Sequence, residues 1–270
     1  MTAPPFDCIT FLTDYGLAAG FVGTCHGIAA RIAPHARVID VTHDVPPQDV
    51  RTGALVLAQS IDYLPVAVHV AVVDPGVGTE RRGIAVSGRH GLFVGPDNGL
   101  LTWAFPAGDV AGAWELANEE LFLRPVSRTF HGRDVFMPVA AHLCNGTEPA
   151  ALGPELDPAG LTRLPEPHLA AADGVLEAEA QLVDRFGNVQ LAARRRDLEE
   201  AGLAGERELR LELDGRQVPV SLAGTFGEVP PGALLVYEGS AGYLVVAVHG
   251  ASAAAELEVS PGRRIRLTKP

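Results

Sequence analysis

The sequence predicts an α/β N-terminal domain with a mainly parallel central sheet, followed by a smaller, mostly antiparallel β C-terminal domain. Three observations support this fold class. The chain has 270 residues, more than a single domain usually holds. Its first half alternates short apolar runs with stretches of helical spacing. Its last part is a series of short alternating strands separated by turns that contain Gly and Asp.

The domain boundary is predicted from a change in composition. Residues 161–174 carry two prolines and little periodicity, so we expect a linker there. The predicted N-terminal domain covers residues 1–165, and the predicted C-terminal domain covers residues 174–270.

The N-terminal part is predicted to run strand, helix, strand, helix, strand. Short links between such elements favour parallel strands joined by right-handed crossovers. The first helix should end before Pro34, and the second should stop at Pro65. The predicted strands are 8–13, 38–41, 66–73, 84–87 and 91–94; the predicted helices are 21–32, 50–63, a segment capped by Asp97 or Asn98 that runs to Trp103, and 134–143.

The C-terminal part is predicted to contain mostly strands, a pattern typical of a small sandwich or barrel. The predicted strands are 176–183, 189–192, 208–213, 218–222, 233–237, 243–248 and 264–267, with helices at 195–201 and 252–257.

Composition excludes several classes of function. A formal net charge of −12 leaves no basic face for a nucleic-acid partner. No stretch of about 20 residues is apolar enough to span a membrane, and the N-terminus does not resemble a signal peptide. Three cysteines without a CxxC motif predict reduced thiols in a cytoplasmic protein. The nine histidines show no ligand spacing in the sequence, so no metal is expected.

The segment 72–86 is the most informative part of the chain. Asp74 ends one apolar run, and a Pro-Gly-Val-Gly turn brings Arg81 to the start of the next. A carboxylate and a guanidinium therefore face one loop at strand ends, where catalytic groups concentrate. A connecting turn with a surface ion pair explains the same pattern. Gly76-Val77-Gly78 lacks the further residues of a dinucleotide or phosphate loop.

Other short motifs each allow a functional and a structural interpretation. His131 stands between an aromatic residue and a glycine just before a predicted helix, which suits either a catalytic imidazole or a structural donor. Asp184-Arg-Phe-Gly-Asn and Glu238-Gly-Ser-Ala-Gly-Tyr are binding motifs or ordinary turns.

Together with Phe-Leu-Thr-Asp-Tyr-Gly, Val-Asp-Pro-Gly-Val-Gly-Thr, Gly-Pro-Asp-Asn-Gly-Leu-Leu and Thr-Phe-His-Gly-Arg-Asp, these motifs occur in an order that resembles one family. It is the S-adenosyl-L-methionine (SAM) hydrolase (adenosine-forming) family, also called SAM hydroxide adenosyltransferases. Its relatives are the fluorinating and chlorinating SAM halogenases. The resemblance covers essentially the whole chain.

The resemblance implies roles for particular residues. Asp74, Arg81 and His131 match the catalytic residues that position and activate a water or hydroxide. Asp14 matches the carboxylate that accepts from the ribose diol. The remaining matches bind substrate: Asp184 and Asn188 near the methionine and nucleoside ends with Phe186 between them, Phe226 against the adenine, and Ser240 at the amino-acid end.

The resemblance further implies that SAM is hydrolysed at C5′ to adenosine and L-methionine without a cofactor, in a homotrimer whose sites lie between subunits. Family members often hold the methionine amino group with an acidic or polar pair, where this chain has Ala19 and Gly20. Halogenases place Tyr at the positions of Asp74 and His131, and fluorinating ones carry Ser at the position of Gly132. The hydrolase branch is therefore favoured; the alternatives are a chloride-using halogenase and a non-catalytic SAM or adenosine sensor.

Overall fold

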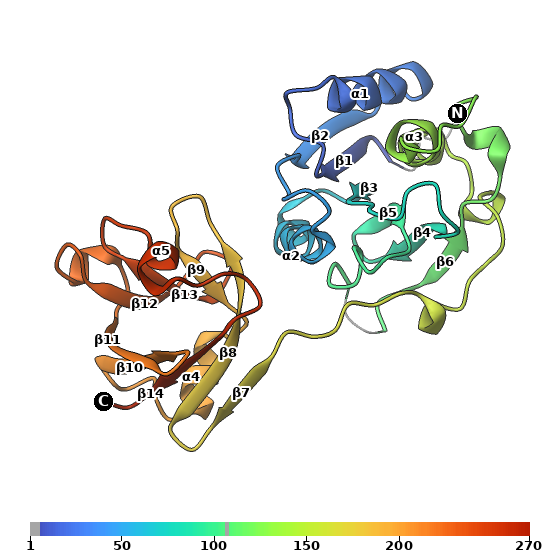
Figure 1. Ribbon diagram of the computed structural model, residues 1–270. Helices are drawn as coiled ribbons and strands as arrows, with labels where there is room; N and C mark the ends of the chain where they lie inside the picture. The colour runs from blue at the N-terminus through green and yellow to red at the C-terminus, as the bar shows by residue number, and fades with distance from the viewer. Residues whose placement is uncertain (1–5, 106–107) are drawn as a thin grey trace. The chain divides into compact units, whose positions relative to one another are not determined.

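The computed structural model describes residues 6–105 and 108–270. The chain divides into two compact units, Met1–Leu164 and Pro165–Pro270. Each unit contains its own sheet, and both units are rich in strands and contain few helices (Figure 1).

The N-terminal unit is built on a six-stranded mixed sheet with the order β2-β1-β3-β5-β4-β6. The pairs β2–β1, β1–β3 and β3–β5 are parallel, whereas β5–β4 and β4–β6 are antiparallel. Three of the five pairings are therefore parallel, so the expected mainly parallel sheet is confirmed in part, and the sheet is mixed because its β5–β4–β6 side is antiparallel. The strands are β1 (Cys8–Thr13), β2 (Arg37–Thr42), β3 (Ala67–Val72), β4 (Gly83–Gly88), β5 (Gly91–Pro96) and β6 (Gly112–Glu115).

The antiparallel side follows from the length of one connection. Only Arg89 and His90 separate β4 from β5, and Gly88 pairs with Gly91 across this hairpin. Two residues can close an antiparallel hairpin, whereas a parallel pair needs a crossover of a dozen or more residues.

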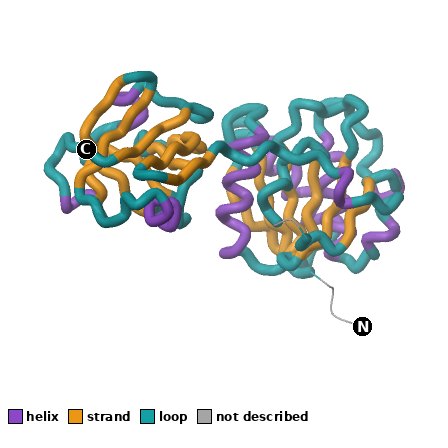
Figure 2. The backbone as a smooth tube through the Cα atoms, turned by 90° about the horizontal axis from the view of Figure 1, so that it is seen from below, coloured by secondary structure: helices purple, strands orange, loops and turns teal. Residues whose placement is uncertain are grey.

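Helices cover both faces of this sheet. Helices α1 (Phe21–Ile32) and α3 (Met137–Cys144) contribute side chains to one hydrophobic core against the sheet. Helix α2 (Val50–Ser60) contributes to a second hydrophobic core. Figure 2 shows helices on either side of the strands of this unit. Because both faces are covered, every residue of β1 and β3 is buried.

The segment after β5 differs from the sequence prediction, because residues 98–103 form turns and no helix. The Asn98 side-chain amide donates to the Val73 carbonyl at 2.8 Å, and its Oδ1 accepts from the Leu100 backbone N–H at 3.1 Å. Asn98 thus ties this turn to the end of β3 instead of starting a helix. Strand β6 was not predicted.

The C-terminal unit forms a closed, barrel-like sheet. Seven strands follow the order β14-β10-β11-β12-β13-β9-β8, and β14 pairs with β8 to close the ring (Figure 1). The pairing is antiparallel except between β11 and β12, which are parallel. The strands are β8 (Val175–Val183), β9 (Val189–Leu191), β10 (Glu208–Leu213), β11 (Arg216–Leu222), β12 (Leu234–Glu238), β13 (Leu244–Val248) and β14 (Arg264–Thr268), with helices α4 (Arg195–Glu200) and α5 (Ala253–Leu257).

An eighth strand, β7 (Leu169–Ala172), lies within the segment expected to be a linker, and it pairs with β8. Asp173 and Gly174 connect the two strands, with φ angles of 50° and 80°. Two residues of positive φ are typical of the tight hairpin turn that matches strand twist.

None of the helices in the described part of the chain is long and apolar enough to cross a membrane. Cys8, Cys25 and Cys144 are buried, free thiols.

Candidate active site

The three residues predicted to be catalytic meet in the N-terminal unit. Asp74 follows β3, Arg81 precedes β4, and His131 comes directly before a helical turn at Gly132–Phe136. Arg81 Nε donates to both carboxylate oxygens of Asp74, at 2.9 and 3.0 Å, and Arg81 Nη2 also donates to Asp74 Oδ2. The same Nη2 lies 2.9 Å from His131 Nδ1. The guanidinium therefore joins the carboxylate and the imidazole into one hydrogen-bonded set.

These contacts determine the protonation state of His131. A guanidinium has only donors, so His131 Nδ1 must accept this hydrogen bond, and the neutral imidazole then carries its proton on Nε2. Burial lowers the pKa of His131 from the ordinary value of 6.5, and the positive charge of Arg81 lowers it further. At neutral pH the imidazole is thus an uncharged donor through Nε2.

We expect this arrangement to appear in the pH dependence of catalysis. Below the lowered pKa of His131, Nδ1 gains a proton, loses the bond from Arg81 and places a second cation beside the guanidinium. Activity should therefore be level around neutral pH and fall as the pH drops through the lowered pKa of His131, with the midpoint of that acid limb below 6.5. A profile of kcat/KM against pH measures this, with His131→Asn as the variant that should lack this acid limb in its residual activity. A midpoint above 6.5 for that limb would contradict the assigned state.

The loop before Arg81 approaches the segment that carries His131 closely, and that segment is held by its own hydrogen bonds. Gly78 has a φ of +76°, and a Cβ added there would lie 2.3 Å from the Arg128 carbonyl oxygen, so only glycine fits. The buried Asp134 accepts from the Ser127 backbone N–H at 2.8 Å and from Arg133 Nε at 2.6 Å. The turn at 75–78 therefore lies directly against the segment that carries His131, and Asp134 holds the conformation of that segment.

Asp14, the predicted ribose-binding residue, follows β1 in the same unit. Its Oδ2 accepts from the Gln48 backbone N–H at 2.8 Å. Burial raises the pKa of the neighbouring Tyr15 well above 10, and nearby groups that include Asp14 and Asp74 raise it further. Tyr15 therefore lies within electrostatic range of both carboxylates. The sequence assigned it no role, although it stands inside the Thr-Asp-Tyr-Gly motif.

Arg81 and His131 also line an open pocket of about 690 Å³. Neither Asp74 nor Asp14 is among its lining residues. The pocket therefore lacks both carboxylates predicted to act on the nucleoside, and we expect the nucleoside to bind elsewhere.

Four of the five predicted binding residues of the C-terminal unit share one open pocket of about 740 Å³. Two of them are joined by a hydrogen bond, in which Asn188 Nδ2 donates to Asp184 Oδ2 at 2.8 Å. Asp184 Oδ1 also accepts from the backbone N–H groups of Phe186 and Asn188, at 2.8 and 2.9 Å. The lining residues are Asp184, Phe186, Asn188, Phe226, Tyr237, Val248, Gly250, Ala251 and Ser252.

The fifth residue, Ser240, lies in the turn between β12 and β13 and does not line this pocket. Tyr237 does line it and was missed from the sequence. Its ring centroid is 5.1 Å from that of Phe226. Strand alternation places Tyr237 on the same side of β12 as the buried Leu235, and this periodicity is the signal that could have identified it.

Comparisons with known proteins agree over the whole chain. Residues 9–153 match the model of the SAM hydroxide adenosyltransferase N-terminal domain, and residues 178–266 match that of the C-terminal domain. The chain is 54% identical over 261 residues to the (R)-S-adenosyl-L-methionine hydrolase of Salinispora arenicola, covering 96% of this chain and 97% of that protein. A fluorinase of Actinoplanes sp. is 28% identical, with 97% of each chain covered.

A solved structure has the same fold. An uncharacterized conserved protein from Thermotoga maritima superimposes with a TM-score of 0.90 at 36% identity, covering 97% of this chain and 100% of that one. Because both family models match in order and the relatives align over nearly their full length, this chain belongs to the SAM hydroxide adenosyltransferase family.

Proposed function

We propose that this protein hydrolyses SAM by attack of water or hydroxide at C5′, giving adenosine and L-methionine. The observation that carries the proposal is the hydrogen-bonded set of Asp74, Arg81 and His131. The substrate is supported by family membership and by the relative at 54% identity that is named a SAM hydrolase.

In the proposed reaction, the water oxygen forms a bond to C5′ while the C5′–S bond breaks. The electron pair of that bond stays on sulfur, which becomes the thioether of methionine, and the water loses one proton. A sulfonium is already a good leaving group, so the reaction needs no general acid, metal or cofactor. The protein's contribution is to align the nucleophile with C5′ and to help remove the proton.

Asp74 and His131 divide that work. The Nδ1 lone pair of His131 is occupied by Arg81, so His131 contributes a hydrogen bond from Nε2 that orients the oxygen. The carboxylate of Asp74 keeps free lone pairs beside its hydrogen bonds to Arg81. It accepts a hydrogen bond from the water and then the proton that the water loses. Arg81 fixes the geometry of both.

For the substrate, we assign the ribose diol to Asp14, because a carboxylate can accept from two vicinal hydroxyls. The pocket of the C-terminal unit supports the other assignments, with Phe226 against the adenine and Asp184, Phe186 and Asn188 around the nucleoside and methionine ends. Ser240, outside that pocket, is assigned to the amino-acid end.

The solvent should supply the new oxygen. In water labelled with heavy oxygen, mass spectrometry should find the label in the 5′ hydroxyl of adenosine. The reaction should run without chloride, and adding chloride should yield no 5′-chloro product. Unlabelled adenosine, a chlorinated product or an absence of turnover would each contradict the proposed hydrolysis.

The proposal includes a homotrimer in the cytoplasm. The candidate residues fall in both units of the chain, and in the proposed assembly the two sets meet between subunits. The buried, free thiols are consistent with a reducing compartment.

Co-refolding inactive His131→Ala subunits with inactive Asp184→Ala subunits should restore part of the activity, because some mixed sites draw an intact residue from each parent. A fully active monomer in light scattering would overturn this assembly.

A further inference from the structure

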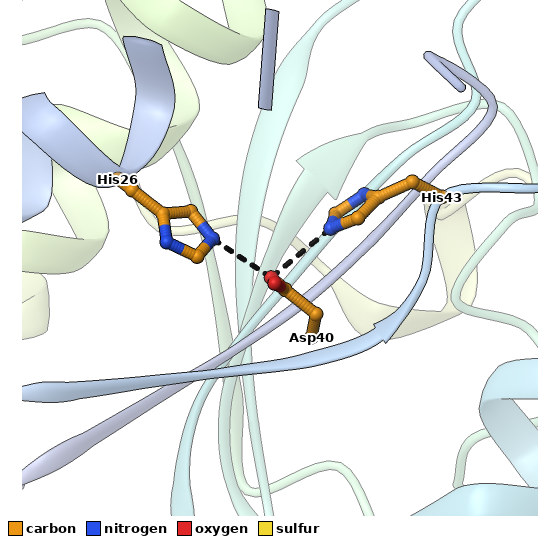
Figure 3. Close-up of side chains that lie close together, drawn as sticks. All are labelled: His26, Asp40 and His43. Carbon is orange, nitrogen blue, oxygen red and sulfur yellow. Dashed lines mark hydrogen bonds and ion pairs between the residues drawn. The ribbon is translucent and has the colours of Figure 1, made fainter. Parts of the chain in front are cut away.

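Three potential metal-binding side chains meet on α1 and β2. His26 comes from α1, Asp40 from β2, and His43 directly follows β2. Figure 3 shows both imidazole rings directed at the Asp40 carboxylate. His26 Nε2 lies 2.8 Å and His43 Nε2 lies 3.0 Å from the same oxygen, Asp40 Oδ1. One donor atom from each residue lies within 4.8 Å of the others, so the three can bind one ion.

The positions of both ring nitrogens of His43 are also typical of a metal ligand. His43 is 4% exposed, and its Nε2 is held 3.0 Å from Asp40 Oδ1. Its other nitrogen, Nδ1, lies 2.8 Å from the hydroxyl of Thr13. If Nδ1–H donates to that hydroxyl, Nε2 keeps a free lone pair. Metal-binding histidines are typically oriented in this way by a bond from the second ring nitrogen.

The cluster is also open to ions from solvent. The side chains of His26 and Asp40 are 37% and 41% exposed, whereas that of His43 is 3% exposed. An ion can therefore arrive from outside and keep water in its remaining positions.

We infer that His26, Asp40 and His43 form a binding site for a divalent transition metal of the zinc type. Two imidazole nitrogens and one carboxylate oxygen suit Zn²⁺, whereas Mg²⁺ and Ca²⁺ prefer oxygen ligands throughout. Tetrahedral Zn²⁺ places its ligand atoms about 3.3 Å apart. The contacts of 2.8 and 3.0 Å to Asp40 Oδ1 need to widen by up to about 0.5 Å, and the two imidazole nitrogens, which lie within 4.8 Å of each other, need to reach the same spacing; the exposed side chains of Asp40 and His26 leave room for both adjustments.

The site would be separate from the proposed water-activating set. It would link α1 to the end of β2, and through Thr13 to the end of β1. The Thr13 hydroxyl also accepts from the Tyr15 backbone N–H at 3.1 Å, next to Asp14. The sequence did not reveal this cluster because its ligands lie on two elements, without a ligand motif.

Metal binding can be measured directly and does not depend on the proposed hydrolysis. Full-length, tag-free protein, treated with a chelator and dialysed, would be titrated with Zn²⁺ by calorimetry and with Co²⁺ by visible absorption. We expect one equivalent per chain and d–d bands without a thiolate charge-transfer band. His26→Gln and Asp40→Asn should each weaken binding at least about tenfold, and Thr13→Val should weaken it by a similar factor through loss of the orienting hydroxyl.

His168→Gln provides the matched control. His168 is half-buried and pairs with Glu177 at 2.8 Å, but it lies outside this cluster, so its loss should leave metal affinity unchanged. Thermal melting without metal checks that each variant is folded. No binding by the folded wild-type protein, binding that survives both His26→Gln and Asp40→Asn, or a thiolate band would overturn the inference.

Discussion

Asp74→Asn is expected to lower the rate of SAM hydrolysis by about 10²- to 10⁴-fold while adenosine binding stays largely intact. The amide keeps the shape of the carboxylate but loses its charge. It also presents an NH₂ group where both oxygens of Asp74 now accept from Arg81. Single-turnover assays of adenosine formation measure the rate, and calorimetry measures binding.

Asp97→Asn is the matched control for this experiment. Asp97 forms a second ion pair with Arg82, and its side chain is as buried as that of Asp74, at 4% against 6% exposed. Its replacement removes a comparable pair outside the proposed site, so turnover per folded molecule should be preserved. Near wild-type turnover in Asp74→Asn would remove Asp74 from the mechanism.

Gly132→Ala is expected to reduce turnover on the order of 10²-fold, with a loss of about 1–3 kcal/mol in the free energy of unfolding. A Cβ at this position would lie 2.1 Å from the Tyr15 hydroxyl oxygen and 3.0 Å from its Cζ. Tyr15 has little room to move, because its ring packs edge-on against Phe11 and Phe130. The strain would therefore shift the backbone next to His131.

Two further variants test that steric explanation by steady-state kinetics and thermal melting. Gly23→Ala, on α1 with no atom within 4 Å of the added Cβ, should keep both turnover and stability. Tyr15→Phe combined with Gly132→Ala removes the clashing hydroxyl and should recover part of the activity. Equal losses in the double and single variants would show that Tyr15 is not the obstacle.

Much of this protein could be predicted from its sequence, because the relevant signals are local. The strand at Cys8–Thr13, the helix at Phe21–Ile32 and the strand at Glu208–Leu213 lie where periodicity predicted them. Asp74 and Arg81 were selected because they flank a glycine-rich turn between two apolar runs, and the structure brings them together.

Other features were decided only by tertiary structure, because they depend on groups that are distant in sequence. Asn98 forms a turn because the Val73 carbonyl, at the end of β3, accepts its amide hydrogen. The protonation of His131 depends on Arg81, which reaches it from another loop. Gly132 is required because Tyr15 fills the space beside it, and His26 reaches Asp40 only when α1 packs beside β2. Local sequence determines where strands and helices begin and end, whereas burial and long-range pairing determine which side chains meet and in which charge state.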